Sequence, residues 1–298
     1  MAKHRHRSRR QRDSLAAAVF IGPDLVGLAV FVLLPIAFAT YVSFFSWNLI
    51  GPMKFVGLAN YQRLLADSDW WASLGRTLQF ALIYVPTLFG TALALAVAFN
   101  ALTGKASVIL RSAYLLPFAV TSVIASTLWM FLYQEKTGYL NAFLNLLGIA
   151  DQPFIGSPSQ AMASVIVVVL WINLGYTSML LFSAIKQVPA ELLEAARLDG
   201  ASGPRTFWSI VFPLIRPTSI FVVVTSTIAA FQILDIILVM TSGGPADATQ
   251  VGALYIYKRS FERLEMGYGS ALSVVMFAIL LVISLVQLRL TRRNNLEG

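Results

Sequence analysis

The chain alternates between long apolar stretches and short polar ones. Six of the apolar stretches are long enough to cross a membrane, because about 20 apolar residues in a helix span the hydrocarbon core of a bilayer. They cover residues 15–45, 77–99, 112–133, 161–185, 218–240 and 271–288. Pro35, Pro86 and Pro117 lie inside the first three and predict bends there. The pattern predicts an all-α integral membrane protein with six transmembrane helices.

The segments between these stretches give weaker signals. Residues 59–65 and the sequence TGYLNAFLNLLG at 137–148 predict short helices outside the spans. The sequence TSGGP at 241–245 predicts a turn, because Gly and Pro interrupt regular structure. Trp70 and Trp71 precede the second span, and we expect them at the membrane–water interface, where tryptophan is enriched.

Composition supports a membrane protein. The 298 residues are 57% hydrophobic and 12% charged, with a mean hydropathy of +0.73, whereas soluble domains carry about 25% charged residues. Cysteine is absent, which excludes disulfides and thiolate metal ligands. The two histidines, His4 and His6, lie in the basic N-terminal segment, so we expect no metal site.

The basic residues predict the orientation. Fifteen of the 22 Lys and Arg residues fall in the two terminal segments and in the loops 100–111 and 186–216, and the remaining seven fall in the three alternate loops. Because the more basic loops stay in the cytoplasm, both termini are predicted to be cytoplasmic. This asymmetry and the basic tail 1–14 account for the net charge of +8 without a nucleic-acid partner, and the tail could contact anionic lipid.

One predicted cytoplasmic loop, residues 186–217, is rich in charged residues and lies between two apolar spans. Glu191, Glu194 and Arg197 recur every three residues, and Leu192, Leu193 and Ala196 form an apolar stripe between them. This spacing predicts a short two-faced helix. Gly200 can end that helix with a left-handed turn, and a second short helix is predicted over 205–211, before Pro213 and Pro217.

The same loop resembles the EAA loop of ABC importer permeases. That motif has Glu-Ala-Ala, three residues, Gly, nine residues and Ile-x-Leu-Pro; here it is Glu194-Ala195-Ala196, Gly200 and Ile210-Val211-Phe212-Pro213, with Phe in place of Leu. The resemblance implies a coupling helix that docks onto a cytoplasmic ATPase. The residues implied in this contact are Glu191, Glu194, Ala195, Ala196, Asp199 and Gly200. An ordinary amphipathic surface helix is the alternative interpretation.

Further motifs resemble the sugar-type permeases of this family. They are Gly57-Leu58-x-Asn60-Tyr61, the sequence TSGGP, and Gly267-x-x-Ser270-Ala271. The resemblance extends from Pro23 to Arg289 and implies the type I (MetI-like) permease fold. The expected organisation is a basic cytoplasmic tail at 1–14 and a permease domain at 15–298, with its core at about 73–288.

Polar residues inside the fourth and fifth spans are candidates for a solute path. They are Asn173, Tyr176 and Thr177, which share one helix face, and Ser226, Gln232 and Asp235. Such residues either bond neighbouring helices or line a path. The resemblance favours the path, because maltose-type permeases contact sugar at the positions of Tyr176 and Ser226. Two other contact positions, Ala230 and Ile233, are apolar here, which puts the same sugar in doubt.

Asp235 is the acid placed deepest in a predicted span. A charge at that depth faces a cavity or a partner, and an ion pair or a helix cap near the external end is the structural alternative. A secondary transporter driven by an ion gradient, with Asp235 as its coupling acid, is an alternative function. A membrane scaffold or sensor that transports nothing is a second one.

The sequence contains no Walker-type GxxxxGK[ST] loop and no motif of a hydrolase or metalloprotease. We therefore expect ATP and Mg²⁺ in a separate ATPase dimer and no cofactor in this chain. The resemblance implies three further partners: a second homologous permease, an extracytoplasmic solute-binding protein and a carbohydrate substrate. It also implies a prokaryotic inner membrane. The identity of the solute does not follow from the sequence.

Overall fold

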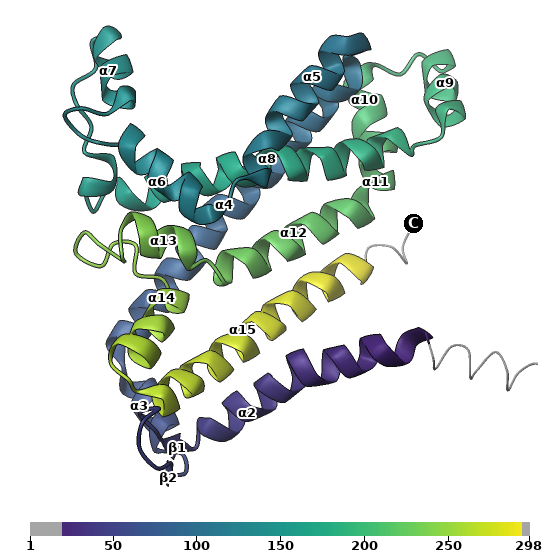
Figure 1. Ribbon diagram of the computed structural model, residues 1–298. Coiled ribbons are helices and arrows are strands. Elements are labelled where there is room, and N and C mark those ends of the chain that lie inside the picture. The colour runs from purple at the N-terminus through teal and green to yellow at the C-terminus, as the bar shows by residue number, and fades with distance from the viewer. Residues whose placement is uncertain (1–19, 294–298) are drawn as a thin grey trace, which may run out of the picture. The chain divides into compact units, whose positions relative to one another are not determined.

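The computed structural model describes residues 20–293 and is mostly helical (Figure 1). Four helices are long and apolar enough to span a membrane: Phe20–Val42, Ser68–Ala101, Ala161–Lys186 and Met266–Arg289. Two further pairs of helices pass the same test but are bent, and each pair counted as one span brings the total to six. The predicted basic tail at 1–14 and the start of the first predicted span lie outside the described residues.

The chain divides into two units. Unit 1 contains the residues up to Asp67 together with Ile256–Phe277. Its elements are η1 (Ala29–Leu33), α2 (Leu34–Val42), β1 (Phe45–Ser46), β2 (Lys54–Phe55), α3 (Ala59–Ala66), η5 (Lys258–Glu262) and the first part of α15 (Met266–Arg293). The two short strands pair antiparallel, with Phe45 opposite Phe55. The predicted helix at 59–65 is confirmed as α3.

The first membrane helix of unit 1 is almost bare, with 6% of its apolar window buried within the chain. The π-helical turn η1 directly precedes Pro35. Proline lacks an N–H and cannot complete the hydrogen bond to the preceding turn, which accounts for the local change in helix geometry. An apolar surface this large is left for lipid or for other subunits.

Ion pairs and one close backbone contact tie the pieces of unit 1 together. Arg63 bonds both carboxylate oxygens of Glu265 at 2.9 Å, and the Tyr268 hydroxyl donates to Asp67 at 2.5 Å. Gly267 passes so near β1 that a Cβ there would lie 1.8 Å from the carbonyl oxygen of Phe45. Glycine is therefore required at this point, where α15 meets the hairpin.

Unit 2 contains residues 68–255 and the C-terminal part of α15 from Ala278. Its long helices are α4 (Ser68–Ala101), α8 (Ala161–Lys186) and α12 (Arg216–Phe231). Its shorter elements are α5 (Gly104–Leu115), η2 (Leu116–Ala119), α6 (Ser122–Leu132), α7 (Tyr139–Leu146), η3 (Phe154–Gly156), α9 (Ala190–Leu198), α10 (Gly203–Thr206), η4 (Phe207–Val211), α11 (Phe212–Leu214) and α13 (Asp235–Met240). The helix α14 (Gly252–Tyr257) has residues in both units. The predicted helix within 137–148 is confirmed as α7.

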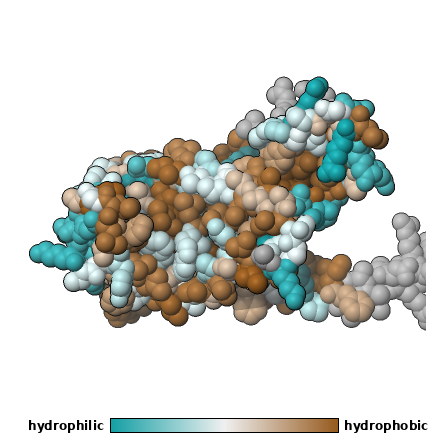
Figure 2. Space-filling view, turned by 90° about the horizontal axis from the view of Figure 1, so that it is seen from above, coloured by the Kyte–Doolittle hydropathy of each residue, from teal (hydrophilic) through white to brown (hydrophobic). Residues whose placement is uncertain are grey.

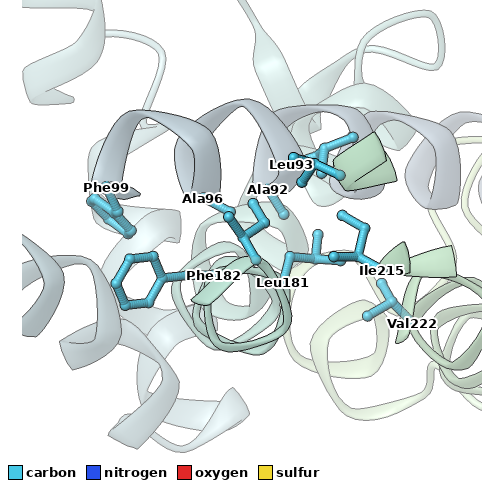
Figure 3. Packing of buried hydrophobic residues seen from close by; sticks show 10 residues of the cluster. Ala92, Leu93, Ala96, Phe99, Leu181, Phe182, Ile215 and Val222 are labelled. Carbon is cyan, nitrogen blue, oxygen red and sulfur yellow. The ribbon is translucent and has the colours of Figure 1, made fainter. Parts of the chain in front are cut away.

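The core of unit 2 lies where α4, α8 and α12 meet. Its buried side chains come from α4 (Ala92, Leu93, Ala96, Phe99), from α8 (Leu181, Phe182, Ile185) and from the segment Val211, Ile215 and Val222. They point toward one another in Figure 3. We call this set the joint cluster. The alanines of α4 allow the close helix contact that membrane helices need in the absence of a strong hydrophobic driving force.

Two predicted spans are interrupted, which corrects the sequence analysis. The third, 112–133, is split between η2 and α6, and the helices around the break meet at 101°. The break follows Pro117, where the prediction placed a bend. Before the break, the chain lies close to α8: a Cβ on Gly175 would lie 1.8 Å from the carbonyl oxygen of Tyr114 at the end of α5. Here α8 passes directly against the backbone of α5.

The fifth predicted span, 218–240, is also wrong as one helix, because α12 ends at Phe231 and α13 begins at Asp235. The last turn of α12 is closed by the Gln232 N–H, which donates to the carbonyl oxygens of Ile228 and Ala229, both at 3.2 Å. Asp235 occupies the first turn of α13, where a carboxylate is favoured by the helix dipole. The polar residues Gln232 and Asp235 thus lie at an interruption of the predicted span and do not form a polar face along one continuous helix.

The prediction for Trp70 is wrong as well. Its side chain is fully buried and lies 6.2 Å from the Tyr255 ring, centroid to centroid. Helix α4 begins at Ser68, nine residues before the predicted start of the second span, and this turns Trp70 inward. Trp71, its neighbour, is exposed, and the interface position stays a prediction for it alone.

Candidate functional site

The charged loop folds as the sequence predicts, with α9 over Ala190–Leu198 and Pro189 just before it. The exposed side of this helix includes Glu191, Glu194, Ala195 and Asp199. Leu198 is 89% exposed although it is apolar, and Leu192 is 43% exposed. A short helix that presents both charge and apolar surface to its surroundings is typical of an interaction site.

Gly200 ends α9 with a left-handed backbone, φ +74°. The Ala201 N–H donates to the Ala196 carbonyl oxygen at 2.9 Å and the Gly200 N–H to that of Arg197 at 3.1 Å. These two bonds define a Schellman cap, and they confirm the predicted role of Gly200 in ending the helix. No other atom lies within 4 Å of where a Cβ on Gly200 would be, so the position opens outward.

The inner side of α9 is held by apolar contacts. Ala196 is buried, and Leu193 packs against the joint cluster of α4, α8 and α12. Phe207 and Phe212, from the segment after α9, pack against the same cluster. The loop is therefore anchored to the core through one face, and the opposite face carries the exposed residues.

The second helical segment of the loop is longer than predicted. It begins at Gly203, with Pro204 in the first turn, and runs through α10, η4 and α11 to Leu214. It then meets α12 at 69°, with Ile215 buried at the bend. Trp208 is 61% exposed on this segment. In Figure 1 the α9 end and the α7 end stand at opposite ends of unit 2.

A cavity of about 180 Å³ lies at the interruption between α12 and α13. Five helices and the connecting segment contribute to its lining. The residues are Phe80 and Tyr84 of α4, Ser122 of α6, Val169 and Asn173 of α8, Ala229 and Ala230 of α12, Gln232, Ile233 and Leu234 of the connection, and Asp235 and Ile236 of α13. We call this the α12–α13 cavity. It brings together three of the predicted path residues, Asn173, Gln232 and Asp235.

Asp235 is the charged residue of the lining and its side chain is exposed. One carboxylate oxygen, Oδ2, accepts a hydrogen bond from Ser122 Oγ at 3.3 Å. Within residues 20–293, no ion pair involves Asp235. The alternative of an ion pair thus finds no support. The alternative of a helix cap is met only in part: Asp235 lies in the first turn of α13, where the helix dipole favours a carboxylate, but no side chain makes a capping hydrogen bond there.

Other polar groups of the cavity remain open to a ligand. Asn173 donates from Nδ2 to the carbonyl oxygen of Val169 in its own helix at 2.9 Å, which leaves its Oδ1 as an acceptor. Tyr84 is 2% exposed, and its hydroxyl bonds no other residue of the described chain. The N–H groups of Ile233 and Leu234 likewise donate to no residue between 20 and 293. Buried polar groups of this kind normally have a partner.

The other three predicted path residues do not line this cavity. Tyr176 is 41% exposed and stacks on Phe118, with ring centroids 4.4 Å apart and planes 9° from parallel. Thr177 and Ser226 are buried in the helix packing. The predicted common face of Asn173, Tyr176 and Thr177 is therefore divided among three environments.

Sequence analysis did not single out Phe80 and Tyr84, which stack with centroids 5.3 Å apart. Their i, i+4 spacing was a signal for one shared face, but in an apolar span nothing distinguished that face from the rest. Nothing in the sequence set Ser122 apart from the other hydroxyl-bearing residues of the predicted spans. Its contact with Asp235 joins positions 113 residues apart.

The described chain thus has the features of a multi-pass membrane transporter subunit: interrupted helices around a cavity lined in part by polar residues, large apolar areas on the face that Figure 2 shows, and an exposed loop helix. A family model describing the inner membrane component of binding-protein-dependent transport systems matches residues 64–295. The chain belongs to this family, the permease subunits of ABC importers. An ion-gradient-driven transporter therefore finds no support.

Named relatives and solved structures agree with this assignment. The chain is 32% identical over 285 residues to the sulfoquinovosyl glycerol transport system permease protein SmoG of Agrobacterium fabrum, covering 95% of this chain and 92% of that protein. It is 34% identical to the sn-glycerol-3-phosphate transport system permease protein UgpA of Brucella abortus, covering 92% and 94%. The fold also matches a bacterial ABC transporter involved in the import of alginate, with a TM-score of 0.82, 21% identity and 97% and 99% coverage. The expected type I permease fold is confirmed.

Proposed function

We propose that this chain is one half of the membrane pathway of an ATP-driven importer for a carbohydrate or a related polyol compound. Family membership makes it a permease subunit, and the substrates named for SmoG and UgpA support the solute class. The observation that carries the coupling part of the proposal is α9: it matches the EAA motif, is exposed on one face and is anchored to the core by the other.

In this proposal α9 docks into a cleft on a cytoplasmic ATPase. The contact residues are Glu191, Glu194, Ala195, Asp199 and Gly200, with Leu192 and Leu198 supplying exposed apolar area. Ala196, expected among the contacts, is buried and supports α9 from its inner side. Motion of the ATPase pair would reach α4, α8 and α12 through Leu193 and the joint cluster. ATP and Mg²⁺ would be bound by the ATPase dimer, so this chain performs no hydrolysis of its own.

A second, homologous permease completes the pathway in this proposal. The α12–α13 cavity, at about 180 Å³, is smaller than ligand pockets of roughly 300–1,000 Å³, so a single chain supplies part of a site. The bare helix Phe20–Val42 offers apolar surface for lipid or for a neighbouring subunit. An extracytoplasmic binding protein would deliver the solute to the loops on the side opposite α9.

The proposal includes an orientation in the membrane. With α9 facing the ATPase, both termini are cytoplasmic in a prokaryotic inner membrane, in agreement with the distribution of basic residues. The permease domain comprises 15–298 with a core near 73–288, preceded by the basic tail 1–14. Solute would pass the α12–α13 cavity, and the exposed Tyr176–Phe118 pair offers an aromatic face for a sugar ring.

Two matched variants test the docking role. Gly200→Arg places a large side chain at the outward-facing end of α9, whereas Gly148→Arg changes the end of α7. Gly148 has φ +76°, nothing within 4 Å of a Cβ, and the same two capping bonds, from Gly148 N–H to Asn145 and from Ile149 N–H to Leu144. The backbone strain is therefore equal in the two variants.

The complex is purified with its ATPase and reconstituted with its binding protein, and ATP-dependent uptake into proteoliposomes is measured. Gly200→Arg is expected to lose the ATPase on purification or to hydrolyse ATP without uptake, while Gly148→Arg keeps the ATPase bound. Wild-type-like uptake by Gly200→Arg, or equal loss of the ATPase in both variants, would contradict docking through α9. Flux in the wild-type complex also excludes a scaffold or sensor that transports nothing.

A further inference from the structure

We propose that the α12–α13 cavity selects neutral, hydroxyl-rich solutes against anionic ones, and that Asp235 is the residue that determines this selection. The proposal rests on the function proposed above, because it assumes that solute passes the cavity. It concerns a property that the family assignment leaves open, since UgpA is named for sn-glycerol-3-phosphate, whose phosphate is anionic.

The lining of the cavity carries one fixed negative charge. Asp235 is the single charged member of the twelve residues that line the cavity, and none of them is Lys, Arg or His. The salt bridges within the described chain involve Arg63 and Arg259 of unit 1, and none of them involves Asp235. An anion in the cavity would therefore meet a negative charge that no cationic side chain of the lining balances.

The hydrogen-bonding groups of the cavity also match a neutral solute. Ser122 engages one oxygen of Asp235, which leaves the second oxygen as an acceptor. The Asn173 Oδ1 is a further acceptor, and the Gln232 side chain and the Tyr84 hydroxyl can both donate and accept. Sugar hydroxyls also donate and accept, so they match this mixed set. Phosphate, sulfonate and carboxylate groups accept only, and they leave the acceptors of the cavity unsatisfied.

The positively polarised groups of the cavity do not reverse this preference. They are the N–H groups of Ile233 and Leu234 and the first turn of α13. All of them lie within two residues of Asp235, whose carboxylate already compensates their partial charge. Helix starts attract anions where no fixed carboxylate is present, and here one is built into the same turn.

The magnitude is large enough to measure. Two like unit charges about 5 Å apart near a protein surface change a binding constant by roughly 100-fold, and screening by salt reduces the effect to about 10-fold. Removal of the charge with little change of shape, as in Asp235→Asn, is expected to abolish most of this discrimination. Asp235→Lys is expected to reverse it.

The test uses the full membrane complex of both permeases and the ATPase dimer in nanodiscs, without nucleotide and without the binding protein, so that selection by the binding protein is bypassed. The probes are glucose against glucuronate, and glycerol against sn-glycerol-3-phosphate. Their relative affinities are measured by saturation-transfer NMR at low and physiological salt. The wild type is expected to favour each neutral member by about 10-fold, and Asp235→Asn to narrow the ratio to within about 3-fold.

Asp247→Asn is the matched control, because it removes a carboxylate that lies after the GGP turn and outside the cavity lining. In this variant the ratio of the affinities for the neutral and the anionic probe should stay at the wild-type value. Thermal unfolding of each variant separates a change in selection from a loss of the favourable interaction between Asp235 and the α13 helix dipole. Equal binding of the paired probes, an unchanged ratio in Asp235→Asn, an equal shift in Asp247→Asn, or no binding of either neutral probe would each overturn the proposal. ATP-dependent uptake is scored separately, so a complex that imports solute with an unaltered ratio refutes the selection and leaves the proposed function intact.

Discussion

The α9 loop and the α12–α13 cavity are built in opposite ways. The loop is local: nine consecutive residues form its helix, one glycine ends it, and its exposed face is readable from the order of the residues. The cavity is assembled from α4, α6, α8, α12 and α13, and its key contact, Ser122 to Asp235, joins distant parts of the chain. The comparison teaches that a docking surface can be carried by one segment, whereas a solute site needs several.

Helix α12 connects the two regions. Val222, in its first half, belongs to the joint cluster on which Leu193 packs, and Ala229 and Ala230, near its end, line the cavity. At a rise of about 1.5 Å per residue, Val222 and Ala230 are about 12 Å apart along the axis of the continuous helix α12. Changes at the joint cluster should therefore affect both regions, and changes at either end should affect one.

The largest effect is expected from Phe182→Ala, which empties the centre of the joint cluster. Phe182 is buried against Phe99, with ring centroids 6.4 Å apart, and such a truncation costs about 3–5 kcal/mol. Both ATPase binding and solute binding should decline, and the thermal unfolding temperature of the purified complex should fall. Phe221→Ala, on the exposed side of α12, is the control. A Phe182→Ala complex as stable as this control would show that the cluster does not hold the helices together.

Gly175→Ala comes next, because its Cβ would collide with the Tyr114 carbonyl oxygen at 1.8 Å. The helices α5 and α8 would have to separate, at a cost of about 1–3 kcal/mol. Gly90→Ala in α4 has open space at the same position and should be neutral or slightly stabilising. Thermal unfolding compares the two variants, and equal unfolding temperatures would refute the close approach of α8 to α5.

The two faces of α9 are distinguished by Leu193→Ala and Leu192→Ala. Leu193 packs on the joint cluster and its truncation should cost about 1–2 kcal/mol and lower uptake per ATP hydrolysed. Leu192 faces outward, so its truncation should leave unfolding unchanged and weaken retention of the ATPase. A reversed pattern, with Leu192 controlling stability, would show that the packed and docking faces have been interchanged.

The smallest effect is expected from Ser122→Ala, which removes the 3.3 Å bond to Asp235. A hydrogen bond to an exposed partner contributes about 1 kcal/mol or less. Solute affinity should change by only a few-fold, with no change in unfolding or in ATPase retention. Thr127→Ala, whose hydroxyl bonds its own helix at Val123, serves as the control. If Ser122→Ala released the ATPase, the separation between the two regions would be wrong.

The same contrast explains how much could be predicted from the sequence. The helix α9, its end at Gly200, α3 and α7 all followed from residue order, because capping and helix periodicity are local properties. The interruptions at Val120–Thr121 and Gln232–Leu234 did not. In a span that is apolar throughout, hydrophobicity carries no periodic signal, and the position of a break depends on packing such as that of Gly175 against Tyr114.

In the candidate site, too, some residues could be recognised from the sequence and others could not. Asn173, Gln232 and Asp235 were recognisable because polar residues are rare in membrane spans, and the structure brings them into one cavity. Tyr84 and Phe80 were hidden among ordinary apolar positions. Trp70 was assigned to the interface from its residue type alone, and its burial against Tyr255 depends on a contact across 185 residues of chain.

The unwound stretch between α12 and α13 has a consequence for how such permeases can diverge. The Ile233 and Leu234 N–H groups belong to the main chain, and bare peptide groups are tolerated within a membrane only where they line a cavity. No exchange of side chains, short of proline, removes them. Substitutions around this interruption can therefore change the side chains of the cavity without removing its two main-chain donors.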